Sequence, residues 1–326
     1  MQKILGQLAT EIKIRPDQVQ TAVSLLDGGA TVPFIARYRK EVTGGLDDIQ
    51  LRELEYRLGY LRELEERRAT ILKSISDQGK LSPELHLAIE HAATKQDLED
   101  LYLPFKPKRR TKGMIAKEAG LEPLADKLFA QPHLDPAHEA LSFVLAADAI
   151  EGADFSTVKA VLDGVRDLLS ERWAEDAVLL NTLREWLWQE AGLHSSLAKG
   201  KDENHPDVAK FRDYFDYEEA LCKVPSHRAL AVFRGRSLEL LDVKLAVPQT
   251  EPAPDSKVKP ESLALGRIAS HLKWQHKQRA GDDFLRQCID WTWKVKLSLS
   301  CERDLLTRLR ESADKVAIKV FADNLR

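Results

Sequence analysis

The sequence predicts a mainly α protein, a multi-helix array that carries one small β-hairpin insertion. The first observation is a helical period. Over most of the chain, apolar residues recur three and four positions apart, between capping residues and glycines. The second observation is where this period stops. Two short apolar runs, 229–233 and 238–247, flank RGRS at 234–237, and such a pair is typical of a β-hairpin.

Short helices with clear start and stop signals are expected over residues 1–130. One begins at Pro16 and ends at the Gly28–Gly29 pair, and Thr31 is expected to cap the next. The clearest helix is expected over 46–75, because its leucines fall on one face. These leucines are Leu51, Leu54, Leu58, Leu61 and Leu64.

Two further helices are expected after Ser82 and Thr94, which are both good N-caps. Pro104 and Pro107 end the second of them, because proline cannot continue a helix. The stretch 105–117 that follows holds six cations and no carboxylate. We therefore expect an exposed basic loop between two helices.

The second half of the chain is also expected to be helical outside the hairpin. Helices are predicted over 137–192, near 261–280 and 282–291, and from Glu302 onward, with a strand or a helix at 293–300.

Two polar or proline-rich segments suggest domain boundaries, the run AKGKDENHPDV at 198–208 and the run PQTEPAPDSKVKPES at 248–262. From them we predict three regions: a helical N-terminal region at 1–200, a linker with the β-hairpin subdomain at 201–255, and a helical segment at 256–326.

The composition is that of an ordinary globular protein, with 326 residues, 43% hydrophobic, 31% charged and a net charge of −3. Any nucleic-acid contact must therefore come from local cationic groups. Three cysteines make no disulfide framework, the N-terminus lacks the apolar core of a signal peptide, and no apolar run approaches the ~18 residues of a membrane span. We expect a cytoplasmic protein with no membrane partner.

The motifs of catalysis are missing from the sequence. Histidine and cysteine spacings fit no metal site, and there is no phosphate-binding glycine loop and no nucleophile elbow. Asp47–Asp48 and Asp282–Asp283 are adjacent pairs, which suit helix starts better than a shared catalytic face. We expect no metal, no cofactor and no enzymatic activity.

Three cationic groups are the candidate nucleic-acid-binding sites. Their residues are Arg37, Arg39 and Lys40 in the first, Lys106, Lys108, Arg109, Arg110 and Lys112 in the second, and Lys273 and Lys277, flanked by Arg267 and Arg279, in the third. Tyr38 and Trp274 lie among these cations, and such interleaving suits phosphate contact and base stacking. Alternatively, the cations cover apolar surface or pair with the chain's own carboxylates, ten of which lie in 131–180.

Three long segments resemble the N-terminal half of the bacterial Tex family of transcription accessory proteins. They are GATVPFIARYRKEVTGGLDDIQLRELEYRL at 29–58, LEDLYLPFKPKRRTKGMIAKEAGLEPLA at 98–125 and DYFDYEEALCKVPSHRALAVFRGR at 213–236. The resemblance covers essentially the whole chain. The chain departs from it at Arg236, where an acidic residue commonly follows RG, and this changes the charge expected on the hairpin.

The resemblance implies a helical portion with a helix-turn-helix-like element. It also implies that an RNase H-like domain, helix-hairpin-helix elements and an OB-fold RNA-binding domain follow in the family. Residues 1–326 contain none of these, so we expect an N-terminal fragment of a longer protein.

The function implied by the resemblance is that of a transcription accessory protein that binds RNA or DNA, and we favour a role for this portion in nonspecific phosphate contacts. The alternative is a protein-interaction scaffold. It would dock the missing domains, or RNA polymerase or the ribosome, without touching nucleic acid itself.

Overall fold

The computed structural model describes residues 2–107, 109–146, 149–249 and 262–324, with side chains to residue 320. The chain is mainly α, as predicted, with one small antiparallel sheet. It divides into two compact units, residues 1–105 and 106–326. The domain boundaries predicted at 200 and 255 stay predictions.

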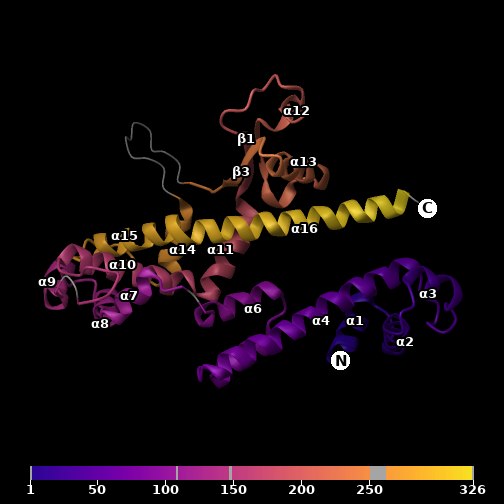
Figure 1. Ribbon diagram of the computed structural model, residues 1–326, viewed down its shortest axis with the longest axis horizontal. Coiled ribbons are helices and arrows are strands. Elements are labelled where there is room, and N and C mark those ends of the chain that lie inside the picture. Colours follow the sequence, from indigo (N-terminus) through magenta and orange to yellow (C-terminus); the bar gives the residue numbers. More distant parts are fainter. Residues whose placement is uncertain (1, 108, 147–148, 250–261, 325–326) are drawn as a thin grey trace. The chain divides into compact units, whose positions relative to one another are not determined.

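The first unit is entirely helical (Figure 1). Its helices are α1 (Gln2–Ile12), α2 (Pro16–Asp27), α3 (Val32–Tyr38), α4 (Asp48–Asp77), α5 (Pro83–His91) and α6 (Lys95–Tyr102), followed by a 3-10 turn at Leu103–Phe105. Side chains of Asp47, Ser82 and Thr94 accept hydrogen bonds from backbone N–H groups in the first turns of α4, α5 and α6. The caps predicted at Ser82 and Thr94 are thus confirmed, whereas Thr31 occupies the N-cap position of α3 but its side chain accepts no capping hydrogen bond.

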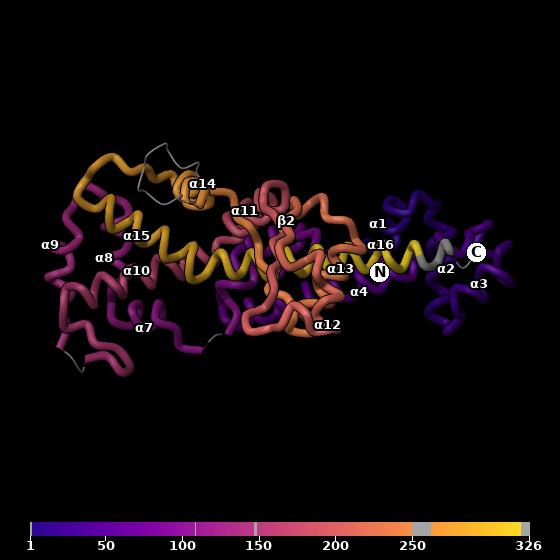
Figure 2. Tube along the Cα trace, turned by 90° about the horizontal axis from the view of Figure 1, so that it is seen from above, coloured from indigo at the N-terminus to yellow at the C-terminus, as the bar shows by residue number. Residues whose placement is uncertain are grey.

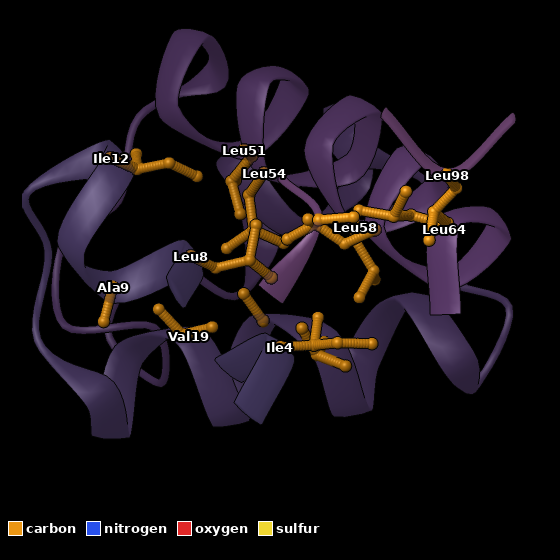
Figure 3. Close-up of a cluster of buried hydrophobic side chains, with 14 of the residues drawn as sticks. Ile4, Leu8, Ala9, Ile12, Val19, Leu51, Leu54, Leu58, Leu64 and Leu98 are labelled. Carbon is orange, nitrogen blue, oxygen red and sulfur yellow. The ribbon is translucent and has the colours of Figure 1, made fainter. Parts of the chain in front are cut away.

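The core of the first unit is built on the leucine face of α4. Leu51, Leu54, Leu58, Leu61 and Leu64 are all buried. Figure 3 shows this face against Ile4 and Leu8 of α1 and Val19 of α2. Farther along α4, the buried Arg68 donates to the carbonyl oxygens of Ile89 and Ala92, which satisfies the C-terminal end of α5.

The second unit has α10 (Val158–Ala174) at its centre, with α7, α8, α9 and α15 packed against it. The other helices are α7 (Lys112–Glu118), α8 (Glu122–Ala130), α9 (Pro136–Ala140), α11 (Ala177–Glu190), α12 (Pro206–Ala209), α13 (Ser226–Ser237), α14 (Leu263–His271), α15 (Asp282–Thr292) and α16 (Ser298–Asn324). Short 3-10 turns lie at Leu141–Phe143, Arg212–Tyr214 and Leu221–Lys223.

The segment for which either a strand or a helix was expected is helical. A π-helical turn at Trp293–Leu297 joins α15 to α16 without a break in the helix.

The sheet has three strands, β1 (Gly192–Leu197), β2 (Asp216–Ala220) and β3 (Leu241–Ala246), in the order β2-β1-β3. Both pairings are antiparallel, and Gly192 lies opposite Ala220 on one side and Ala246 on the other. Side chains of Leu241, Val243 and Leu245 alternate inward. At the edge of the sheet, the N–H of Leu245 donates to the Glu302 carboxylate of α16 at 3.0 Å.

The predicted β-hairpin at 229–247 is wrong. Its first half is the helix α13, which runs through RGRS to Ser237, and only its second half is a strand. Ala229, Val232 and Phe233 are buried, and their spacing of three and then one residue is that of a helix face. The apolar run is too short for its pattern to distinguish a helix from a strand. The strand β3 pairs with the distant β1 rather than with its sequence neighbour.

Because Gly164 has no side chain, helix α10 can pack closely against Phe155 and Leu121 at this position. A methyl group at this position would lie 2.7 Å from Phe155 and 2.8 Å from Leu121, both of which are buried. Such distances are far below van der Waals contact, so any larger side chain forces the packing apart.

We expect Gly164→Val to lower the free energy of unfolding of the second unit by at least about 2 kcal/mol, because overpacked cores lose that much. All six tryptophans lie in this unit, so urea unfolding followed by tryptophan fluorescence reports it selectively. The matched control is Gly266→Val on α14, where an added side chain meets nothing, and it should change stability by less than about 0.5 kcal/mol. Equal midpoints for the two variants would contradict this packing.

Candidate nucleic-acid interface

The first cationic group lies at the end of α3 and in the turn that follows it. Arg37, Arg39 and Lys40 are exposed, and none of them has an ion pair with a described carboxylate. The guanidinium of Arg39 lies over the ring of Phe34, 5.8 Å from its centroid. Phe34 in turn packs against Tyr38, with ring centroids 5.3 Å apart.

The turn after α3 is held by polar side chains beneath it. Thr43 is fully buried, and its hydroxyl donates between the carbonyl oxygens of Arg39 and Lys40, at 3.2 and 3.1 Å. The Gln18 side chain of α2 donates to the carbonyl oxygens of Thr43 and Gly44, at 3.2 and 2.9 Å. Gly44 has φ of +64°, a conformation that other residues adopt at a cost. The backbone that carries the cations is therefore well fixed.

Lys106, Arg109 and Arg110 of the second cationic group lie in a loop, as predicted, whereas Lys112 is the first residue of helix α7. Lys106, Arg109 and Lys112 are exposed, and no described side chain pairs with them. Lys108 lies outside the described residues. Arg110 differs from the others, because its Nε donates to Glu118 at 3.0 Å and its Nη1 to the Glu151 carbonyl at 2.7 Å.

Part of the hydrogen-bonding capacity of the Arg110 guanidinium is therefore used within the protein, by Glu118 and Glu151. The Glu118 carboxylate raises the pKa of its guanidinium, which stays charged. At the end of the same loop, the Thr111 hydroxyl donates to Glu171 of α10 at 2.6 Å while it caps α7. This fixes the direction in which Lys112 leaves the loop.

The third cationic group surrounds the loop between α14 and α15. Lys273 and Lys277 are exposed and have no side-chain partner in the described part of the chain. They border a groove of about 880 Å³, whose walls include Phe129, Leu272 and Arg279. The flanking Arg267 lies over the Trp186 ring at 4.6 Å and so covers apolar surface.

Trp274 is not available as a stacking ring, contrary to expectation. It is only 9% exposed, and its indole N–H donates to Asp282 at 3.1 Å. The fully buried Asp282 also accepts from the backbone N–H groups of Lys277 and Arg279, at 2.8 and 2.9 Å, and from the Arg279 guanidinium. The Arg279 guanidinium, together with these N–H groups, holds the pKa of the Asp282 carboxyl far below its usual value.

The three groups are distributed over the two units. The first belongs to the first unit, and the other two belong to the second. Within the second unit, Figure 2 shows α7 and α14, which adjoin the second and third groups, on opposite sides of α10 and α15. The second and third groups are therefore separate candidate contacts.

Two functional features were not found from the sequence. Phe34 was not singled out, although a spacing of four from Tyr38 places both rings on one helix face. Asp282 begins α15, as predicted, but its carboxylate also accepts hydrogen bonds from backbone N–H groups of the loop before this helix, which the sequence did not indicate. No sequence pattern indicated that Asp282 bonds to Trp274, because the two residues are eight positions apart in the chain.

Among residues 2–324, outside the gaps given above, no group of three or more histidine, cysteine, aspartate or glutamate side chains could hold a metal ion. No described helix is long and apolar enough to cross a membrane.

Comparison with known proteins gives a consistent result. Residues 2–76 match the family model of the Tex-like protein N-terminal domain, and residues 131–321 match that of the Tex central region. Protein YhgF of Escherichia coli is 52% identical over 98% of this chain and 40% of its own length. Transcriptional accessory protein Tex of Neisseria gonorrhoeae is 47% identical over the same shares. Human S1 RNA-binding domain-containing protein 1 is 28% identical over 98% of this chain and 31% of its own length.

The network around Asp282 predicts an acid sensitivity. Because the pKa of this carboxyl is lower in the folded chain than in the unfolded one, its contribution to stability is present above pH ~4 and is lost as the pH falls from there. Asp282→Asn removes this titration, so the stability of the second unit should depend less on pH below ~4. At neutral pH the variant should lose about 2 kcal/mol or more, because hydrogen bonds to a charge are broken.

The test is urea unfolding by tryptophan fluorescence between acid and neutral pH. Asp283→Asn is the matched control, since the neighbouring carboxylate is 85% exposed and bonds only to His276 among the described side chains. A variant of Asp282 that kept the acid dependence of the unsubstituted chain would contradict the assignment.

Proposed function

The chain belongs to the family of Tex-like proteins, and on this premise we propose that it contributes nonspecific phosphate contacts to a transcription accessory protein that binds RNA or DNA. The names of two relatives, a transcriptional accessory protein and an S1 RNA-binding domain-containing protein, support a role related to nucleic acid. The chain spans about two fifths of the length of its bacterial relatives, so the proposal concerns this portion only.

The observation that carries the proposal is a set of exposed cations without carboxylate partners among the described residues. In the three groups they are Arg37, Arg39, Lys40, Lys106, Arg109, Lys112, Lys273 and Lys277. Elsewhere in the chain many cations are paired, as Arg62 is with Asp27 and Arg172 with Asp126. Unpaired surface cations release counterions when they meet phosphates, and this supplies affinity without sequence preference.

Several finer features belong to the same proposal. The short connection 28–31 between α2 and α3 suits a helix-turn-helix-like element. We place the protein in the cytoplasm, with RNA polymerase or the ribosome as the candidate macromolecular partner.

We also propose that this chain has no catalytic role. The acidic pairs are used in the structure, since Asp47 caps α4 and Asp282 holds the loop before α15. Nucleotide or nucleic-acid hydrolysis by the pure chain, abolished by changing one of its own carboxylates, would overturn this.

The second candidate is a protein-interaction scaffold. One observation favours it: Val316 and Val320 of α16, which lie four positions apart on one helix face, are 46% and 54% exposed. Exposed apolar side chains gathered on one element are typical of protein-binding surfaces. In this case the cations would have no part in binding.

The basic loop offers the sharpest test between the two candidates. Replacing Lys106, Arg109 and Lys112 together by Ser should weaken binding to duplex nucleic acid. The slope of log K against log salt should fall in magnitude by roughly 2–3, because each lost phosphate contact removes about 0.9 from it. Thermal stability should hardly change, because these side chains are exposed and unpaired within the described residues.

The matched control replaces three exposed lysines that lie outside the basic stretch and already have carboxylate partners, Lys127, Lys210 and Lys294. It makes the same change in net charge and should alter the salt slope by less than the test variant does. If the two variants lower the slope equally, only net charge matters. If neither lowers it, the scaffold is favoured.

A further inference from the structure

We propose that the outer face of α3 is a stacking platform for the bases of a single-stranded nucleic acid. The platform consists of Phe34 and Tyr38, with Arg37, Arg39 and Lys40 around them. This inference rests on the proposed function, which consists of contacts with phosphates. It adds contacts with the bases.

The two rings are unusually open to solvent for aromatic side chains. Phe34 is 42% exposed and Tyr38 is 63% exposed, although Val32 and Ile35 of the same helix are buried. The helix thus buries its aliphatic side chains and turns its aromatic ones outward. Their ring planes are tilted by 44°, so each ring keeps a face or an edge open to a ligand.

The charges around the rings select an anionic ligand. Glu41 is the one carboxylate between Val32 and Leu46, and three cations lie in the same stretch. Arg39 sits over the Phe34 ring, where its planar guanidinium can itself extend a stack. Rings interleaved with cations are the arrangement that binds bases and backbone of a single strand together.

The platform is also preorganised. The buried Thr43 hydroxyl and the Gln18 amide hold the turn that carries Arg39 and Lys40, and the N–H of Gly45 donates to the Lys40 carbonyl at 2.8 Å. Since this backbone is already ordered, binding need not order it, and less free energy is lost on association.

The other two cationic groups lack such rings. Trp274 is buried and bonded to Asp282, and Phe105 is half-buried against the core of the first unit. A duplex would also not suit α3, because its bases are already stacked on each other. In a single strand the faces of the bases are free to stack on protein side chains. Of the three cationic groups, the one on α3 is therefore the one that can distinguish a strand with bases from an abasic strand.

The experiment compares two probes on the 326-residue chain, a single-stranded oligouridylate and an abasic strand of the same length and charge. We expect the unsubstituted chain to bind the oligouridylate more tightly. The double variant Phe34→Leu/Tyr38→Leu should lose about fivefold or more per ring in affinity for the oligouridylate. Its affinity for the abasic strand and its salt slope should not change, because no cation is removed.

Tyr38→Phe is the conservative control, since it keeps the ring, and it should bind the oligouridylate as the unsubstituted chain does. Far-UV circular dichroism of each variant checks that the helices persist. If both probes bind equally and the double variant changes neither affinity, the platform is wrong while the phosphate contacts stand. If neither probe binds at low salt, the proposed function fails, and the platform fails with it. Ring-dependent binding of polyglutamate in place of the oligouridylate would assign α3 to an acidic protein partner and overturn the proposal.

Discussion

The backbone of each cationic turn depends on a polar side chain that lies beneath it. Thr43 with Gln18 holds the turn after α3, Thr111 with Glu171 holds the end of the basic loop, and Asp282 holds the loop before α15. Backbone N–H and C=O groups in such turns have no partner in a helix, so they need one from a side chain. Because these anchors satisfy the backbone from inside, the cations themselves are left facing outward.

The chain has nearly equal numbers of positive and negative residues, and its cations are of two kinds, those paired with carboxylates and those without such a partner among the described residues. Arg57, Arg62 and Arg67 are bound to carboxylates of neighbouring helices and help to place α4 among them. Exposed pairs of this kind contribute only about 0–1 kcal/mol each. Among the described cations of the three groups, only Arg110 and Arg279 have such carboxylate partners, which are Glu118 and Asp282.

Local signals explain which parts of the fold could be predicted from the sequence. A cap such as Asp47 acts within three residues of its helix, and the leucine face of α4 repeats over many turns. The sheet could not be predicted, since β1 is poor in apolar residues and its partners are distant in the chain. The same limit applies to Trp274: its cationic neighbours in sequence suggested a free ring, whereas its burial and its bond to Asp282 arise only in the folded loop.

The contact between Glu302 and the N–H of Leu245 has a consequence for self-association. Strand β3 is at an edge of the sheet, and exposed edges invite strands of other molecules to add to them and aggregate. A carboxylate from α16 occupies a hydrogen-bond donor that an incoming strand would need, and it places a negative charge beside it. The α16 carboxylate thus opposes strand addition at this position of the edge.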